Sequence, residues 1–295
     1  MPDGEIKDKP RYYIFHLFFL MNNLLTRVLI AVIFIPFILY ISHFGGIPFM
    51  SFINLLILLG LLEFSSILKL QKISIPQTFL MISGLLVGLS VYFFGDRFIL
   101  LIILFGVLTS GLFQLIRYKF DKAIENLSSF LFGLIYVALF FSFLILIREF
   151  PHKSGLEYRL GGLWIIFLFL CTWCSDILSY FIGTPFGKHK ILPQVSPNKS
   201  WEGSFGGIAG AMLAAFVSKS IFFKEIPLIH LLSLAILISV FGQIGDFVES
   251  SFKRQVSLKD SSSIIPGHGG ILDRFDSLLF SAPLVYFYLT FILYR

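Results

Sequence analysis

The chain has 295 residues, of which 57% are hydrophobic and only 14% are charged, and its mean hydropathy is +0.88. A water-soluble domain has about 25% charged residues and fewer apolar ones, so this composition excludes a water-soluble fold. The net charge of +6 does not indicate nucleic-acid binding, because the basic residues lie between apolar runs and not on one polar face. Lipid is therefore the expected solvent for most of the surface.

Residues 1–23 are expected to form a cytoplasmic or interfacial segment. The apolar stretch from Tyr12 to Met21 is too short to cross a bilayer, and no small-residue cleavage site follows it. Met21 is an alternative start, because the residues after it lead directly into the first long apolar run.

Nine apolar runs follow, each long enough, or nearly so, to cross a bilayer as a helix of about 20 residues. Helices are required because lipid offers the backbone no hydrogen-bond partners, and the alternating strands of about ten residues typical of a barrel are missing. The predicted fold is all-α and polytopic, with about nine transmembrane helices. The runs are 24–42, 47–68, 78–95, 97–117, 127–148, 160–182, 203–223, 227–248 and 277–294.

The distribution of basic residues predicts the orientation of these helices. Sixteen of the 23 Lys and Arg residues fall on the side that holds the N-terminus and the loops after the even-numbered runs. Cytoplasmic loops carry an excess of Lys and Arg, so we expect a multi-pass protein of the inner (plasma) membrane with a cytoplasmic N-terminus and an external C-terminus.

The first charged constellation begins at the end of the sixth run. Asp176 shares a helix face with Ser179 and Tyr180, and Lys188 and Lys199 follow in the next loop. In the same loop, Ser196 followed by Pro197 predicts a helix N-cap with proline at the first helical position. An ordinary polar loop before a capped helix is an open alternative for this segment.

A second constellation begins near the inner end of the eighth run with Asp246, a carboxylate that is costly there unless it is paired or bound to metal. Glu249 lies on the same helix face, and the cations Lys253, Arg254 and Lys259 that follow suit phosphate oxygens. The alternative is an inner-face loop whose charges meet water and lipid headgroups, which explains the cations but not the carboxylates beside membrane spans.

The second half of this constellation is a glycine-rich loop, residues 266–270, followed by a helix that begins with Asp273, Arg274 and Asp276. Such a loop exposes backbone amides, and the start of a helix favours phosphate. Carboxylates for a divalent cation, cations for polyphosphate and a glycine-rich turn together indicate phosphoryl or nucleotidyl transfer. We expect one polar cavity where the cytoplasmic ends of the sixth, eighth and ninth helices meet.

These residues resemble the signature of the phosphatidate cytidylyltransferase family. The matching positions are Ser251-x-Lys253-Arg254, Lys259-Asp260, Pro266-x-His268-Gly269-Gly270 and Asp273-Arg274-x-Asp276. Ser196-Pro197, Lys199, Ser200, Trp201 and Gly203 resemble a second family block, with Asn198, Ser200 and Ser179 departing from the usual residues. By motif the resemblance covers residues 170–280, and for the N-terminal part it depends only on the number of spans.

The resemblance implies that the phosphate of phosphatidate attacks the α-phosphorus of CTP, giving CDP-diacylglycerol and pyrophosphate. It also implies N-terminal transmembrane helices at 24–160 and a C-terminal catalytic transmembrane region at 161–295. The expected cofactor is Mg²⁺ or another divalent cation, and the expected partners are CTP, phosphatidate and the bilayer, with a homodimer left open. Two rival functions are a CTP-dependent enzyme for another lipid phosphate or a polyprenol, and a transporter.

The candidate site residues fall into three groups. Asp246 and Asp273 are the leading metal ligands, with Asp276 and Asp176 next. The catalytic candidates are Lys253, Lys259, Asp260, His268 and Arg274, and the substrate-binding candidates are Asp176, Lys188, Ser196, Lys199, Trp201, Gly269 and Gly270. Glu63 and Gln114 are isolated polar residues in apolar runs, for which interhelical hydrogen bonding is expected rather than catalysis.

Overall fold

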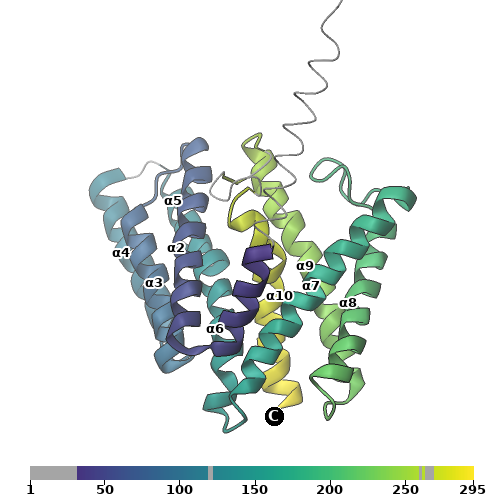
Figure 1. Cartoon of the computed structure of the whole chain (residues 1–295). Coiled ribbons are helices and arrows are strands. Elements are labelled where there is room, and N and C mark those ends of the chain that lie inside the picture. The colour runs from purple at the N-terminus through teal and green to yellow at the C-terminus, as the bar shows by residue number, and fades with distance from the viewer. Residues whose placement is uncertain (1–31, 119–121, 259–260, 263–268) are drawn as a thin grey trace, which may run out of the picture.

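The computed structural model describes residues 32–118, 122–258, 261–262 and 269–295, and within these ranges it contains helices and no β-strand (Figure 1). Eight of its helices are long and apolar enough to cross a membrane. They are α2 (Gly46–Leu70), α3 (Gln77–Phe94), α4 (Ile99–Phe113) with a π-helical extension, α5 (Ala123–Gly133) continuing through a π-helical segment (Leu134–Leu139) into α6 (Phe140–Lys153), α7 (Arg159–Phe186), α8 (Trp201–Ile221), α9 (Leu228–Gln255), and α10 (Leu272–Tyr288) with a π-helical extension.

The predicted all-α, polytopic fold is confirmed, and eight of the nine predicted spans correspond to these eight helices. The first predicted span is represented by the shorter apolar helix Val32–Phe44, because its predicted start at residue 24 lies outside the described residues. The predicted N-terminal segment, residues 1–23, also lies outside them.

Two predicted helix ends were wrong by several residues. The sixth and eighth runs were expected to end at 182 and 248, but α7 continues to Phe186 and α9 to Gln255. Hydropathy falls where charged residues begin, yet the α9 helix continues because Lys253 finds anionic partners inside the bundle. Asp176 and Asp246 therefore lie about ten residues, or roughly 15 Å, before the C-terminal ends of α7 and α9.

Successive helices run in opposite directions, so the connections alternate between the two ends of the bundle (Figure 1). Residues 71–76 and 187–200 lie at one end, which we call the upper end after its place in the figure. Residues 95–98, 154–158 and 222–227 lie at the lower end, together with the C-terminus. This alternation is the one that the sequence predicts.

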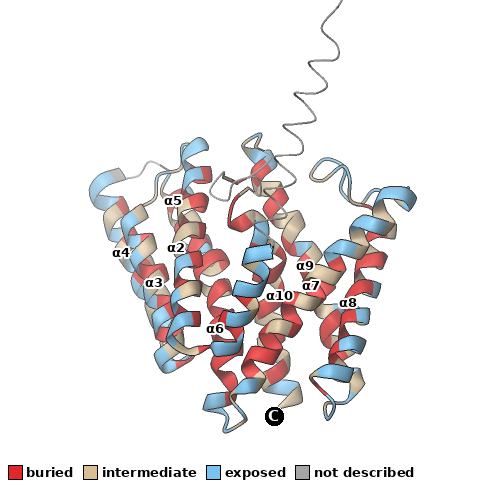
Figure 2. Cartoon of the chain, viewed as in Figure 1, coloured by how far each residue is buried: buried red, intermediate tan, exposed pale blue. Residues whose placement is uncertain are grey.

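α6 and α10 form the buried centre of the bundle, whereas α4 is largely exposed at its edge (Figure 2). The exposed side chains of α4 are apolar, among them Leu100, Leu104 and Leu108. An apolar exposed face is the expected state of a helix that contacts lipid. α10 passes between the α2–α5 group and the α7–α9 group (Figure 1), so it contacts both halves of the chain.

Glycines on α8 bring its backbone against α7. A Cβ atom at Gly206 would lie 3.1 Å from the carbonyl oxygen of Leu178, and one at Gly210 would meet the carbonyl oxygen of Cys174. Small residues spaced in this way let two membrane helices approach closely. The contact fixes the height of Asp176 on α7 relative to the start of α8.

The lower end is held by two buried charged residues of α6. Arg148 donates hydrogen bonds to the backbone carbonyls of Ser42 (2.7 Å) and His43 (2.9 Å). Glu149 accepts from the backbone amide of Gly46 (3.2 Å) and from the hydroxyl of Tyr158 (2.9 Å). Both residues thereby satisfy backbone or hydroxyl groups at the turn between the first two helices.

Candidate active site

A cavity of about 350 Å³ lies between α7, α9 and α10. Four aspartates and two cations line it, so its formal charge is negative. Asp176 comes from α7, Asp246 and Lys253 come from α9, and Asp273, Arg274 and Asp276 come from α10, with Thr172, Trp173, Ser277 and Leu278 completing the wall. The structure thus brings together six predicted site residues from three helices, as the expected shared cavity requires.

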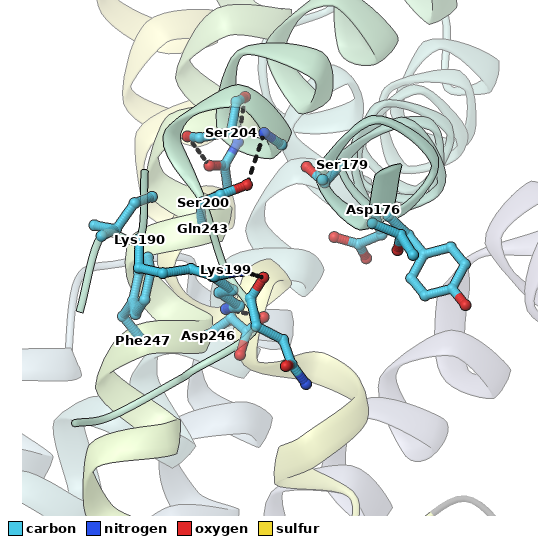
Figure 3. Close-up of a pocket in the computed structure, with 15 residues that line it drawn as sticks. Asp176, Ser179, Lys190, Lys199, Ser200, Ser204, Gln243, Asp246 and Phe247 are labelled. Atoms are coloured by element: carbon cyan, nitrogen blue, oxygen red, sulfur yellow. Dashed lines mark hydrogen bonds and ion pairs between the residues drawn. The ribbon is translucent and has the colours of Figure 1, made fainter. Parts of the chain in front are cut away.

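A larger cavity of about 610 Å³ adjoins the first and shares Asp176 and Asp246 with it. Figure 3 shows Asp176 and Ser179 facing Lys199 and Asp246 across this space. Further polar residues of the wall come from α7, the 187–200 loop, the first turn of α8 and α9. They are Tyr180, Thr184, Lys190, Asn198, Ser200, Ser204 and Gln243. Volumes of about 300–1,000 Å³ are typical of small-molecule sites.

Lys199 is held in place at the mouth of the larger cavity. Its ammonium forms an ion pair with Asp246 and lies 4.4 Å from the centre of the Phe247 ring (Figure 3). The loop that carries it is closed by hydrogen bonds from the amide of Ile191 to the carbonyl of Lys199 (3.3 Å) and from the amide of Trp201 to the carbonyl of His189 (2.9 Å). These contacts set the direction of the Lys199 side chain.

The predicted N-cap at Ser196 is wrong, because α8 begins four residues later and is capped by Ser200. Ser200 has an extended backbone, and its hydroxyl accepts a hydrogen bond from the amide of Gly203 (3.3 Å). Pro197 does not open the helix, since the chain first pairs Lys190 with Ser200 in an isolated antiparallel bridge. Ser200, the last residue of the loop, is therefore the N-cap of α8.

Gln243 was missed by the sequence reasoning. Its side-chain carbonyl accepts from the hydroxyl of Ser204, and its amide donates to the hydroxyl of Ser239 (3.0 Å). Ser239 in turn contacts the hydroxyl of Ser175 at 2.8 Å, so this network joins α7, α8 and α9 behind the larger cavity. A sequence signal exists, because Gln243 is a polar residue in an apolar run, one helical turn before Asp246.

Lys253 lies between two carboxylates. Its ammonium is 2.6 Å from Glu249 Oε2 and 2.6 Å from Asp273 Oδ1, and all three side chains are at least 89% buried. A buried cation needs such partners, because charge separated from water is costly unless it is paired. This group joins α9 to the first turn of α10.

The second oxygen of Asp273 accepts hydrogen bonds from the loop before α10. The donors are the amide of Ser261 (2.8 Å), its hydroxyl (2.9 Å) and the amide of Gly270 (2.8 Å). Both carboxylate oxygens are therefore engaged by protein groups. Asp273 organises the loop in this structure, and its predicted role as a metal ligand stays a prediction.

The other predicted residues are distributed as follows. Lys259, Asp260 and His268 lie outside the described residues. Among the residues that are described, Lys188, Ser196 and Trp201 line neither cavity, and Lys188 and Trp201 are exposed. Gly269 has a left-handed backbone (φ 85°), as expected for a glycine-rich turn. Gln114 accepts a hydrogen bond from Asn126 (3.0 Å), which confirms the expected interhelical bonding.

The described residues contain no group of three or more His, Cys, Asp or Glu side chains assembled to hold a metal ion. The donor chemistry of the smaller cavity nevertheless fits Mg²⁺. Asp176, Asp246 and Asp276 supply carboxylate oxygens, and the described part of the chain gives Asp176 and Asp276 no ion pair. Mg²⁺ is commonly held by one or two carboxylates together with substrate phosphates, so a full protein cage is not required.

Comparisons with known proteins identify the family of this chain. The model of a family described as the cytidylyltransferase family matches residues 25–292. The chain is 36% identical over 272 residues to the phosphatidate cytidylyltransferase of Bacillus subtilis (strain 168), a match that covers 91% of this chain and 97% of that protein. It is 35% identical over 267 residues to the protein of the same name from Staphylococcus epidermidis (strain ATCC 12228 / FDA PCI 1200), with 88% and 95% covered. The protein of that name from Staphylococcus aureus (strain COL) is 33% identical over 268 residues, with the same coverage.

Proposed function

The chain belongs to the cytidylyltransferase family, and from this premise we propose that it makes CDP-diacylglycerol and pyrophosphate from CTP and phosphatidate. The observation that carries the proposal is the cavity shared by α7, α9 and α10, with four aspartates, Lys253 and Arg274 in its wall. Carboxylates for a cation and cations for phosphate oxygens are the groups that nucleotidyl transfer needs.

The proposed reaction needs no protein nucleophile. An oxygen of the phosphatidate phosphate bonds to the α-phosphorus of CTP, and the bond from that phosphorus to the bridging oxygen breaks, so that pyrophosphate leaves with the electron pair. The nucleophile is already an anion, and the protein contributes positioning and electrostatic stabilisation. Arg274 and Lys199, at the two cavities, are the cations that we assign to phosphate oxygens.

A divalent cation is part of this proposal. Asp246 and Asp276 are the residues that would hold it, with Asp176 as a further donor in the same cavity. When bound, such an ion neutralises charge on the phosphates and keeps the attacking and leaving oxygens in line. The negative formal charge of the cavity supports this assignment.

We further propose that the larger cavity takes CTP and that phosphatidate enters from the bilayer. Phosphatidate cannot leave lipid cheaply, at about 0.8 kcal/mol per buried methylene, so its phosphate must meet CTP at the headgroup level. α7 and α9 each have 28 residues, or roughly 42 Å of helix, which exceeds a hydrocarbon core of about 30 Å. If the excess projects at the upper end, Asp176 and Asp246 lie near the membrane surface.

The test is incorporation of radiolabelled CTP into lipid by the purified protein in mixed micelles. Phosphatidate as sole acceptor should yield labelled CDP-diacylglycerol in a magnesium-dependent reaction. Label appearing only with another lipid phosphate or a polyprenol would reassign the acceptor. Without incorporation into any lipid, the enzyme proposal fails, and substrate uptake by proteoliposomes would then test the transporter alternative.

Lys199→Ala is expected to raise the apparent KM for CTP about tenfold or more while changing that for phosphatidate less, because the ammonium faces the cavity assigned to CTP. Steady-state kinetics with each substrate varied in turn would measure both constants. Lys224→Ala, which changes a lysine at the opposite end of the bundle, is the control. A larger effect on the lipid constant would place the 187–200 loop at the lipid headgroup instead.

The proposed location is the inner (plasma) membrane, with the upper end of the bundle in the cytoplasm. Reporter fusions within residues 187–200 and after Arg295 should therefore report opposite sides, the first cytoplasmic and the second external. The structure places these two positions at opposite ends of the bundle (Figure 1). Two reporters on the same side would contradict the topology.

A further inference from the structure

Glu63 is a carboxylate of α2 that is only 2% exposed, and it lies about two turns below the upper end of that helix. Both of its oxygens are engaged at the start of α10. Oε1 accepts from the backbone amide of Ile271 (2.7 Å), and Oε2 accepts from that of Leu272 (2.9 Å). The sequence predicted a hydrogen-bonding role for Glu63, and the structure shows that its partners are the backbone amides at the start of α10.

A carboxylate at this place has a clear physical reason. The first amides of a helix have no partner within the helix, and the helix dipole makes its N-terminus a favourable site for negative charge. The N-terminus of α10 is recessed inside the bundle, where water cannot satisfy those amides. Gly60, one turn before Glu63, faces Val137 and Leu272, since a Cβ atom there would lie 2.9 Å from Val137 Cγ1 and 3.3 Å from Leu272 Cδ2.

Glu63 also holds the other described part of the loop that precedes α10. Its Oε1 accepts from the hydroxyl of Ser262 (2.6 Å), and its Oε2 lies 3.1 Å from that of Ser261. Ser261 also donates its amide to Asp273. A Cβ atom at Gly270 would lie 2.6 Å from Glu63 Oε2 and would also meet the Ser261 hydroxyl, so only glycine fits between the two residues.

These contacts form one continuous chain from the N-terminal helices to the cavity. Glu63 bonds the loop, the loop bonds Oδ2 of Asp273, and Oδ1 of Asp273 pairs with Lys253, which lines the smaller cavity. Glu63 itself is not among the residues that line that cavity in the described structure. It therefore acts on the site through Asp273 and not by contact with substrate.

We propose that Glu63 is a positioning residue, which fixes residues 261–262 and 269–272 and with them the geometry of Asp273 and Lys253 for catalysis. This inference goes beyond the proposed function but depends on it for its kinetic readout. It assigns the N-terminal helices a part in the active site, since the partner of the loop is about 200 residues away in the chain. Nucleotide binding in the larger cavity does not involve Glu63.

The test is Glu63→Gln, which keeps the size of the side chain but replaces one acceptor oxygen by an NH₂ group. That group would face a backbone N–H or a hydroxyl donor, so the bonds from Ser262, Ile271 and Leu272 cannot all be reproduced. We expect kcat to fall about a hundredfold, as for a small displacement of catalytic groups, while the KM for CTP stays within about threefold. Glu63→Asp keeps both acceptor oxygens and should recover part of kcat.

Glu149→Gln is the matched control. Glu149 is also a buried carboxylate that accepts a backbone amide at a helix start, but it lies at the lower end of the bundle. Equal losses of kcat per folded molecule in the two Gln variants, or a Glu63→Gln variant within about threefold of wild-type kcat, would overturn the inference. So would a loss confined to the KM for CTP.

Hydrogen exchange of residues 261–262 and 269–272 provides a readout that does not depend on activity. These amides should exchange faster in Glu63→Gln than in the wild type, and unchanged exchange would overturn the inference. Wild-type protein that incorporates no CTP would remove the proposed function, and the exchange experiment would still decide whether Glu63 fixes the loop.

Discussion

Asp246→Asn is expected to reduce turnover of CTP at least about a hundredfold at every magnesium concentration, while the protein still inserts and folds. Asp246 lines both cavities and pairs with Lys199, so the substitution removes charge at the point where the two proposed substrates meet. Asparagine keeps the size of the side chain, which limits the change to charge and hydrogen bonding. Excess magnesium is not expected to restore the rate, because a metal ion at higher occupancy does not replace the charge of Asp246 at the reacting centre.

The measurement is initial rate against magnesium concentration, with thermal unfolding in detergent as the check on folding. The wild type should gain thermal stability with magnesium in the absence of substrates, and the variant should gain less. Asp96→Asn, which changes an exposed aspartate at the lower end, is the control. More than a tenth of wild-type activity in Asp246→Asn would remove Asp246 from the reacting centre.

The helices could be predicted from sequence because lipid leaves the backbone no alternative. The predicted C-terminal ends of α7 and α9 were wrong, because a fall in hydropathy does not mark the end of a helix. Lys253 and Arg254 close the apolar run of α9 but not its helix, since Lys253 is neutralised by Glu249 and Asp273 within the bundle. A charged side chain that forms an ion pair inside the bundle does not end a helix, and a hydropathy scale takes no account of ion pairs.

The convergence of Asp176, Asp246 and Asp273 was predictable because each carboxylate adjoins an apolar run and is costly there without a partner. The same reasoning applied to Glu63, whose burial was evident from its place in an apolar run. The partners of Glu63 could not be predicted, because Ile271 and Leu272 bond it through backbone amides, which every residue except proline has. Contacts of this kind appear only when the three-dimensional structure is known.

The start of α8 shows a different limit of local reasoning. Ser196 followed by Pro197 is a reasonable helix start by sequence, but Lys190 pairs with Ser200 within the same loop, and α8 begins after Ser200. This pairing turns Lys199 toward Asp246 and leaves Ser196 outside both cavities within the described structure. The bridge within the loop thus moves the cap of α8 from Ser196 to Ser200.

Lys253→Met is expected to reduce both stability and activity more than any other single change of a cation at the site. The substitution keeps the length of the apolar stem but leaves Glu249 and Asp273, whose side chains are 3% and 5% exposed, without their shared cation. Removing one partner of a buried ion pair costs about 3–5 kcal/mol. A lower yield of folded protein and a lower unfolding temperature in detergent should accompany the loss of turnover.

A second substitution separates the structural role of Lys253 from the catalytic role proposed for it. Adding Glu249→Gln to Lys253→Met removes one unpaired buried charge. The double variant should therefore be about 1–3 kcal/mol more stable than the sum of the two single effects predicts. Activity should not recover, because the cavity still lacks the ammonium beside Asp273. Lys219→Met is the control, since that lysine bonds backbone carbonyls of Lys224 and Ile226 at the lower end. If stability and turnover return together in the double variant, Lys253 serves only to neutralise Glu249 and Asp273, and Arg274 and Lys199 are the cations left to act on phosphate.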